Sequence, residues 1–307
     1  MKLIRHATEL GATGRRSCLA IGVFDGVHLG HQQIIRQTIS DARQRDAHAV
    51  VVTFDRHPNA IVAPDRVPPA IYSQSQKIHA IRALGADVLL VIPFDETFSR
   101  LNGESFIRRL ANDLGGIRGI CVGADFVFGH KRSGDMALLR TLGAEMGFQV
   151  HAHAAVALDG QTVSSTRIRE VIRAGDFDAA SQMLGRAYSI AGTVVHGDHL
   201  GQKLGFPTAN MDVSGMVLPM HGVYAARATL AGKTHHAVLN IGLRPTVQQQ
   251  SPQVRVEVHL LEFEREIYGQ ELEIEFAKKL RDEKRFPSLD ALREQIKTDI
   301  ADAKRSF

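Results

Sequence analysis

The sequence feature that most constrains this chain is a glycine-rich stretch near its start, Gly22-Val23-Phe24-Asp25-Gly26-Val27-His28-Leu29-Gly30-His31. An apolar run at 18–21 precedes it and a helical pattern follows it, so the sequence predicts a strand, a turn and a helix. Glycines let the backbone approach an anion, and the start of the following helix stabilises negative charge. The stretch is typical of a nucleotide-phosphate site, to which we assign Gly22, Phe24, Asp25, Gly26 and Gly30.

Two histidines add chemistry to this turn. His28 and His31 are three residues apart at the start of the expected helix, so both rings fall on roughly one face and can donate to the same phosphate. A pair of ordinary turn histidines is the alternative, and the His-x-Gly-His spacing by itself leaves it open. The strand, turn and helix around the motif favour the functional interpretation.

Length and charge limit the classes of protein that this chain can represent. Its 307 residues predict two domains, and a net charge of +4 suits small anionic ligands but is too weak and dispersed to indicate nucleic acid. Cys18 and Cys121 lie in apolar runs, which is typical of buried thiols in a reducing compartment. The first eleven residues lack the apolar core of a signal peptide, and no apolar stretch is long enough to span a membrane. We expect a cytoplasmic protein with no membrane partner.

The first half alternates short apolar runs with longer helical patterns. We expect strands at 18–21, 49–54, 88–92, 119–122 and 149–153, and helices at 29–45, 74–84, 103–113 and 135–146. This alternation predicts a parallel sheet covered on both faces, with ligands beyond the carboxyl ends of its strands. Polar clusters at 25–31, 53–58 and 123–132 follow three of these strands, so we expect them to form one site.

A further helix opens at Val163-Ser164-Ser165-Thr166-Arg167-Ile168-Arg169. A capped helix with solvated arginines is the ordinary interpretation. Hydroxyls, helix-start N–H groups and arginine also make an oxyanion clamp of the kind that a leaving pyrophosphate needs. We favour the clamp because it falls in the same predicted domain as the two histidines.

Near Gly185 the pattern changes to short alternating strands. We expect them at 188–195, 222–230, 237–241, 254–261 and 271–276, followed by a helix at about 288–304 with Leu289, Leu292, Ile296 and Ile300 as its apolar stripe. The pattern predicts an antiparallel sheet or small barrel, and the Gln248 to Gln250 run is expected to be a loop. The predicted domains are therefore 1–185 and 186–307.

A second glycine-rich segment spans 197–210 and lacks the GxxxxGK[ST] pattern. Thr208 and Asn210 are hard oxygen donors two residues apart, so in an extended segment both point the same way and can hold a magnesium ion that carries ATP phosphates. A glycine-rich surface turn with a polar exit explains the spacing equally well.

The strand expected at 254–261 has two unlike faces. Glu257 shares one face with Arg255 and His259, opposite a row of valines. A solvated face accounts for this pattern. If the face lines a cleft instead, Glu257 is suited to act as general base for a substrate hydroxyl.

Taken in order, these stretches resemble the bifunctional bacterial FAD synthetases, which join an FMN adenylyltransferase domain to a riboflavin kinase domain. The resemblance runs from Gly22 to the final helix and rests on segments at 22–31, 53–58, 123–129, 164–169, 205–210, 240–246 and 256–261. It implies an α/β fold with an N-terminal Rossmann-like nucleotidyltransferase domain, followed by a C-terminal antiparallel β-barrel kinase domain with a final helix.

The resemblance also implies two reactions and a set of roles. Riboflavin's hydroxyl attacks the γ-phosphate of ATP to give FMN, and the FMN phosphate attacks the α-phosphate of a second ATP to give FAD and pyrophosphate. The implied roles are catalysis by His28, His31 and Glu257; phosphate binding by Ser164, Ser165, Thr166, Arg169, Gly201 and Gly205; flavin binding by Asp125, Phe126 and Arg281; and magnesium binding by Thr208 and Asn210.

Some positions depart from the family pattern. Arg56 and Val127 replace residues that are more frequent there, and 247–252 lacks glycines, which we expect to alter the flavin site and the closure of the kinase over riboflavin. Two alternatives are that only one activity is retained, or that the chain is a flavin- or nucleotide-binding regulator. The intact residues of both centres disfavour each alternative, and self-association is left open.

Overall fold

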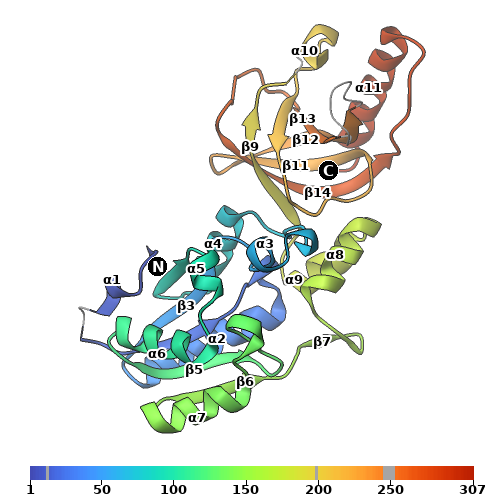
Figure 1. Cartoon of the computed structure of the whole chain (residues 1–307). Coiled ribbons are helices and arrows are strands. Elements are labelled where there is room, and N and C mark those ends of the chain that lie inside the picture. Colours follow the sequence, from blue (N-terminus) through green and yellow to red (C-terminus); the bar gives the residue numbers. More distant parts are fainter. Residues whose placement is uncertain (12–13, 198–199, 245–252) are drawn as a thin grey trace. The chain divides into compact units, whose positions relative to one another are not determined.

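The computed structural model describes residues 1–11, 14–197, 200–244 and 253–307, and it divides into two compact units (Figure 1). The first unit comprises 1–69 and 74–165, and the second comprises 70–73 and 166–307. Among the described residues, none of the helices combines the length and the apolar character needed to cross a membrane.

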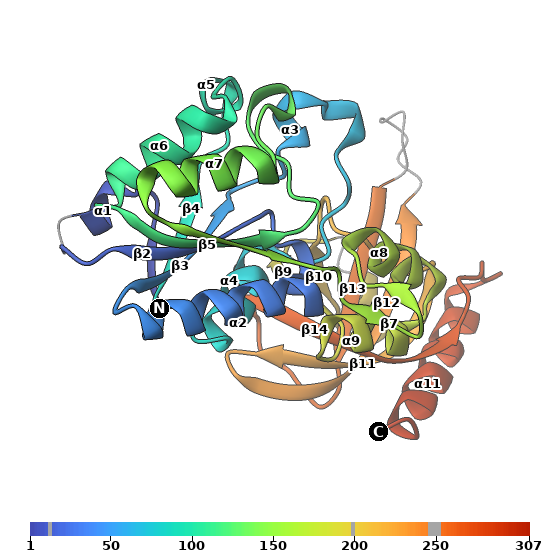
Figure 2. The same cartoon turned by 90° about the horizontal axis from the view of Figure 1, so that it is seen from below.

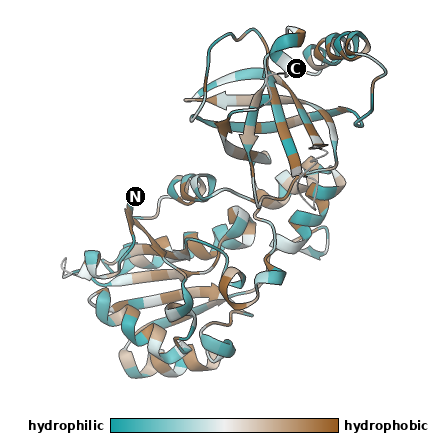
Figure 3. Ribbon diagram, turned by 45° about the horizontal axis from the view of Figure 1, so that its top comes forward, coloured by the Kyte–Doolittle hydropathy of each residue, from teal (hydrophilic) through white to brown (hydrophobic). Residues whose placement is uncertain are grey.

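The first unit is built on a six-stranded parallel sheet in the order β1-β4-β3-β2-β5-β6. All residues of the central strand β2 are buried, and the sheet strands are largely hydrophobic (brown in Figure 3), as expected when helices cover both faces. The predicted parallel sheet is confirmed. Its strands are β1 (Lys2–Ile4), β2 (Ser17–Ile21), β3 (His48–Phe54), β4 (Val88–Ile92), β5 (Ile117–Gly123) and β6 (Gln149–His153).

Helices cover the two faces of this sheet (Figure 2). Apolar side chains of α6 and α7 pack on one face, and those of α2 and α4 pack on the other. Cys18 and Cys121 are free and buried on the α2 face, which confirms the predicted buried thiols. The helices are α1 (Thr8–Gly11), α2 (Leu29–Gln44), α3 (Asn59–Val62), α4 (Gln74–Ala83), α5 (Glu96–Ser99), α6 (Gly103–Asp113) and α7 (Met136–Met146), with 3-10 turns η1 (Asp25–Val27), η2 (Pro64–Arg66) and η3 (His130–Arg132).

A small hairpin, β7 (Ala157–Leu158) and β8 (Gln161–Thr162), follows β6. Two helices, α8 (Ser165–Ala174) and α9 (Phe177–Leu184), follow the hairpin.

The second unit contains a closed antiparallel barrel in the order β10-β13-β12-β11-β14-β9. Closure leaves no unpaired sheet edge. The predicted barrel is confirmed, and its strands are β9 (Ser189–Val195), β10 (Ala209–Asp212), β11 (Gly222–Leu230), β12 (Lys233–Arg244), β13 (Gln253–Leu260) and β14 (Glu271–Arg281), with α10 (Leu200–Leu204) before β10.

The final helix α11 (Leu289–Lys304) packs on this barrel. Its buried residues are Asp299 and Ala303, whereas Leu289 of the predicted apolar stripe is 59% exposed. The two oxygens of Asp299 accept hydrogen bonds from the guanidinium of Arg281 on β14 at 2.8–3.1 Å. An ion pair between the buried Asp299 and the half-buried Arg281 therefore helps the apolar side chains to hold the helix on the barrel.

Candidate active sites

The glycine-rich turn between β2 and α2 adopts a backbone conformation that favours glycine. Gly26, Phe24 and Val27 have φ values of 75°, 52° and 42°. A Cβ atom on Gly22 would lie 3.1 Å from the ring of Phe24, and one on Gly30 would lie 3.3 Å from the ring of His28. The two outer glycines therefore allow aromatic rings to fold tightly against the turn.

The structure brings the two predicted catalytic histidines together. The rings of His28 and His31 stack with their centroids 3.6 Å apart and their planes 20° apart, and the ring of Phe24 meets that of His31 edge-on at 5.2 Å. His28 is the N-cap residue of α2 and is only 7% exposed. Two imidazoles thus lie at a helix start, where backbone N–H groups and the helix dipole favour an anion.

A buried lysine that the sequence analysis did not identify lies beneath this turn. The ammonium of Lys77, on α4, donates to the carbonyl of Phe54 at 3.2 Å and lies 3.5 Å from the carbonyl of Val23. Burial lowers the pKa of Lys77, and the charges of Asp25 and Asp55 oppose that effect. The available signal was its position one helical turn before the buried Ile81, on the apolar face of α4.

The residues of the predicted pyrophosphate clamp differ in their burial and in the unit to which they belong. The hydroxyl of Ser165 donates to the carbonyl of Asp25 at 3.2 Å, which ties the start of α8 to the glycine-rich turn. Arg169 is 8% exposed and so is not a solvated arginine, whereas Thr166 is exposed and Ser164 is half-buried. Thr166 and Arg169 belong to the second unit, and their action on the same phosphate as the histidines stays a prediction.

The first unit contains a cavity of about 530 Å³ lined by residues that follow β2, β3 and β5. Of the three polar clusters expected to form one site, those at 53–58 and 123–132 contribute lining residues, whereas none of 25–31 is among the described residues that line the cavity. The rings of Phe126 and Phe128 stack in its wall at 5.1 Å, and Lys131 and Arg132 contribute cationic side chains. Such a lining suits a flat aromatic ring that carries a phosphate. Its aromatic residues are Phe54, Phe94, Phe98, Phe106, Phe126 and Phe128.

Of three residues that the sequence analysis named for the flavin site, Val127 lines this cavity, whereas Asp125 and Arg56 are not among the described lining residues. Val127, one of the departures from the family pattern, lines it and is 40% exposed. Asp125, expected at the flavin, is exposed and is not among the described residues that line the cavity. Arg56, the other departure, forms an ion pair with Asp55 at 3.2 Å.

The second unit contains a cavity of about 300 Å³ lined by Thr208, Asn210 and the segment 263–268. Two glycines make room for the polar side chains. A Cβ atom on Gly197 would clash with the side-chain amide of Asn210, and one on Gly201 would lie 3.0 Å from the hydroxyl of Thr208. Gly205, with φ 87°, forms the turn that leads into the segment of Thr208 and Asn210.

Two stretches near this cavity in the sequence, 198–199 and 245–252, lie outside the described residues. They include the predicted glutamine loop and the departure from the family pattern at 247–252.

Glu257 on β13 lies directly opposite Asn210 on β10 in the antiparallel register. Its carboxylate accepts a hydrogen bond from Arg255 at 3.3 Å, and its side chain is 29% exposed. Nδ1 of His259 lies 2.8 Å from the carbonyl oxygen of Pro207, just before β10. The structure thus brings Glu257 beside the predicted magnesium ligand Asn210, although Glu257 itself is not among the described residues lining the cavity.

Arg281, expected at the flavin, has a structural partner. Its guanidinium binds Asp299 on α11, donates to the carbonyl of Asp282 and lies 5.6 Å from the ring centre of Phe286. These contacts assign Arg281 to the attachment of the final helix, and contact with a flavin stays a prediction.

The first unit has stacked histidines at a helix start on a parallel sheet, and the second has a carboxylate beside two oxygen donors on a barrel. Both arrangements suit an enzyme that transfers phosphate groups at two centres. Family models agree with this division, because one described as FAD synthetase matches residues 11–167 and one described as Riboflavin kinase matches residues 184–307. The chain belongs to the family of bifunctional riboflavin kinase/FMN adenylyltransferases, which confirms the resemblance found in the sequence.

Relatives with that description match over the full length. The protein from Haemophilus influenzae is 38% identical over 309 residues, covering 100% of this chain and 99% of the relative, and the protein from Escherichia coli K12 is 37% identical, covering 100% and 98%. A solved structure described as a macrolide-efflux protein from Streptococcus pneumoniae has the same fold, with a TM-score of 0.81, 27% identity and 98% of each chain covered.

Proposed function

We propose that this chain makes FAD from riboflavin in two ATP-dependent steps, with adenylyl transfer assigned to residues 1–185 and phosphorylation assigned to residues 186–307. The chain is an enzyme of its family, a riboflavin kinase and FMN adenylyltransferase. The observation that carries the assignment is the stacked pair His28 and His31 at the start of α2, in the same unit as the aromatic cavity.

In the adenylyl transfer step, a phosphate oxygen of FMN attacks the α-phosphate of ATP in line and pyrophosphate leaves. No covalent enzyme intermediate is required, so catalysis consists of positioning and charge stabilisation. His28 and His31 donate to the α-phosphate as its charge builds, and Ser165, Thr166 and Arg169 hold the leaving phosphates. The aromatic cavity takes the flavin ring, and Lys131 and Arg132 attract its phosphate.

In the kinase step, Glu257 accepts the proton of riboflavin's primary hydroxyl as the oxygen attacks the γ-phosphate of ATP. The hydrogen bond from Arg255 holds the carboxylate in place beside Asn210. Thr208 and Asn210 offer hard oxygen donors, and the absence of side chains at Gly197 and Gly201 leaves room around them, so this pair fits magnesium. Thr208 and Asn210 would hold this ion, which would supply positive charge to offset that of the ATP phosphates.

A time course of products tests both steps. The purified chain is incubated with riboflavin, ATP and magnesium, and riboflavin, FMN and FAD are separated by chromatography. We expect FMN to rise before FAD. Accumulation of FMN alone would exclude the adenylyl transfer step, and FAD formed only when FMN is supplied would exclude the kinase step. No product from either substrate would identify a flavin-binding regulator instead.

A further inference from the structure

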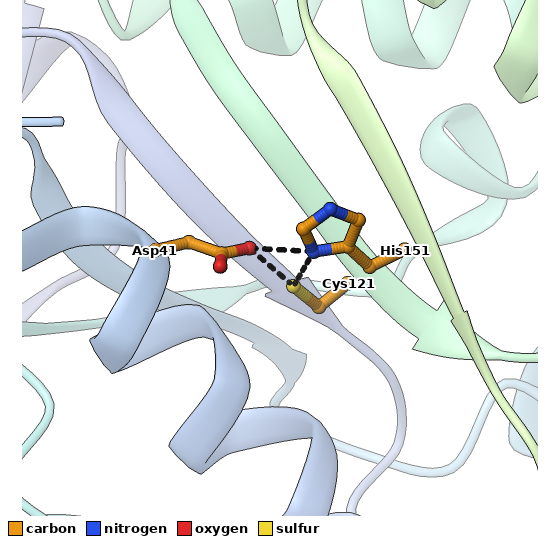
Figure 4. Close-up of side chains that lie close together, drawn as sticks. All are labelled: Asp41, Cys121 and His151. Carbon is orange, nitrogen blue, oxygen red and sulfur yellow. Dashed lines mark hydrogen bonds and ion pairs between the residues drawn. The ribbon is translucent and has the colours of Figure 1, made fainter. Parts of the chain in front are cut away.

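Three side chains of types that bind metals meet on the α2 face of the sheet (Figure 4). Asp41 comes from α2, whereas Cys121 and His151 each lie two residues before the end of their strands, β5 and β6. Asp41 lies ten residues beyond His31 along α2, which is about 15 Å at the rise of an α-helix. We propose that Asp41, Cys121 and His151 form a zinc site that is separate from both catalytic centres.

The distances suit a zinc ion. Oδ2 of Asp41 lies 2.7 Å from Nδ1 of His151 and 3.4 Å from Sγ of Cys121, and Sγ lies 4.0 Å from Nδ1. Tetrahedral zinc with these ligands separates their atoms by roughly 3.3–3.7 Å. The carboxylate of Asp41 and Nδ1 of His151 now share a proton. Zinc would replace this proton at Nδ1, and the neutral imidazole would carry its proton on Nε2 instead. The carboxylate and the imidazole would then move apart, and the sulfur would move inward. Shifts of about half an ångström at each atom complete the geometry.

Charge also favours a divalent cation. Asp41 is 3% exposed and Cys121 is fully buried. When zinc binds, the thiol proton leaves to solvent. The two charges of Zn²⁺ are then balanced by the thiolate and the carboxylate, and the imidazole is neutral, so no net charge is buried. Sulfur and imidazole ligands select zinc over the magnesium that the reactions use.

The residues around Asp41, Cys121 and His151 orient one ligand and leave an entry path for an ion. The amide of Gln37 donates to Oδ1 of Asp41 at 2.7 Å and leaves Oδ2 directed toward the cluster, as partners of metal ligands commonly do. β6 is an edge strand, and the side chain of His151 is 35% exposed. An ion can therefore enter from this edge, and a water molecule can fill the fourth position.

Titration of the full chain, stripped of metal, tests this site. Zinc is titrated against a chromogenic chelator, and cobalt(II) is used as a spectroscopic probe of sulfur ligation. We expect one tight zinc per chain and a thiolate-to-cobalt charge-transfer band. Cys121→Ser should abolish the band, and His151→Gln should weaken zinc binding at least about tenfold.

Matched controls separate this cluster from other ligands. Cys18→Ala removes the other cysteine of the chain, and His153→Gln changes the neighbouring histidine on the same side of β6. Both should keep the band and tight binding. The proposal is overturned if the wild type binds no zinc tightly, if tight binding survives His151→Gln, or if Cys18→Ala alone removes the band. Because His151 is partly exposed, His151→Gln decides the matter even if Cys121→Ser fails to fold.

Discussion

At the scale of single residues, the proposed function assigns His28 to the adenylyl transfer centre and Glu257 to the kinase centre. His28→Ala removes one of two donors at the start of α2 and is expected to lower FAD formation from FMN at least about 100-fold while FMN formation continues. Glu257→Ala should stop FMN formation and spare FAD formation when FMN is supplied. Separate assays of the two steps check this, with exposed His79→Ala as control. Loss of both activities from either change in a folded protein would contradict the two-centre assignment.

Lys77 gives a second prediction at this scale. Its ammonium donates to the carbonyl of Phe54 and lies close to that of Val23, beside the glycine-rich turn. Burial lowers its pKa, which means that the charged form of Lys77 is less favourable in the folded protein than in water. Lys77→Met should therefore lower adenylyl transfer at least about tenfold without lowering the melting temperature. Arg82→Met, on the exposed side of the same helix, is the matched control. A melting temperature that falls together with both activities would indicate a purely structural role.

The sequence predicts site residues when the side chains that act together are only a few positions apart in the chain. His28 and His31 are one helical turn apart, and Thr208 and Asn210 are two residues apart, so their shared faces follow from spacing. Lys77 and Asp299 act through partners far away in the sequence, and no local pattern identifies such partners.

At the scale of elements, the long helices and strands could be predicted to within a few residues because their apolar periods are complete. The three-residue β1 and four-residue β10 could not, because neither is long enough to show alternation and each is defined by pairing with a distant strand. The extensions of β12 and β14 beyond their predicted ends likewise depend on closure of the barrel.

The attachment of α11 gives a prediction about an element. Asp299→Ala leaves the guanidinium of Arg281 without its carboxylate partner, and their side chains are 5% and 19% exposed. We expect the free energy of unfolding to fall by about 3 kcal/mol, and the double change Arg281→Met with Asp299→Leu to recover most of it. Denaturant unfolding measures the stability. If the double variant is stable but makes no FMN, then Arg281 also binds the flavin as the sequence suggested.

Asp55 links the ends of two strands and predicts a pH dependence. Its carboxylate follows β3 and accepts the N–H of Phe94, which follows β4, at 2.9 Å. Burial alone would raise its pKa, but this hydrogen bond and Arg56 hold the pKa below the ordinary 3.8. The stabilisation is thus complete above 3.8, and it is lost as the pH falls below 3.8 through the lowered pKa of the folded state. The gap in melting temperature between wild type and Asp55→Asn should narrow in acid, and an unchanged gap would contradict this assignment.

At the scale of the whole molecule, the stacked histidines with their aromatic cavity belong to the first unit, and Glu257, Thr208 and Asn210 belong to the second. If each centre works with its own residues, an FMN molecule made by one chain can be used by another. A mixture of the His28→Ala and Glu257→Ala variants should therefore make FAD from riboflavin far faster than either variant does alone. Because FMN must then cross the solvent, the lag before FAD appears should lengthen on dilution. If the mixture forms FMN but no FAD, while the Glu257→Ala variant still converts supplied FMN, then FMN must pass between the centres within one chain.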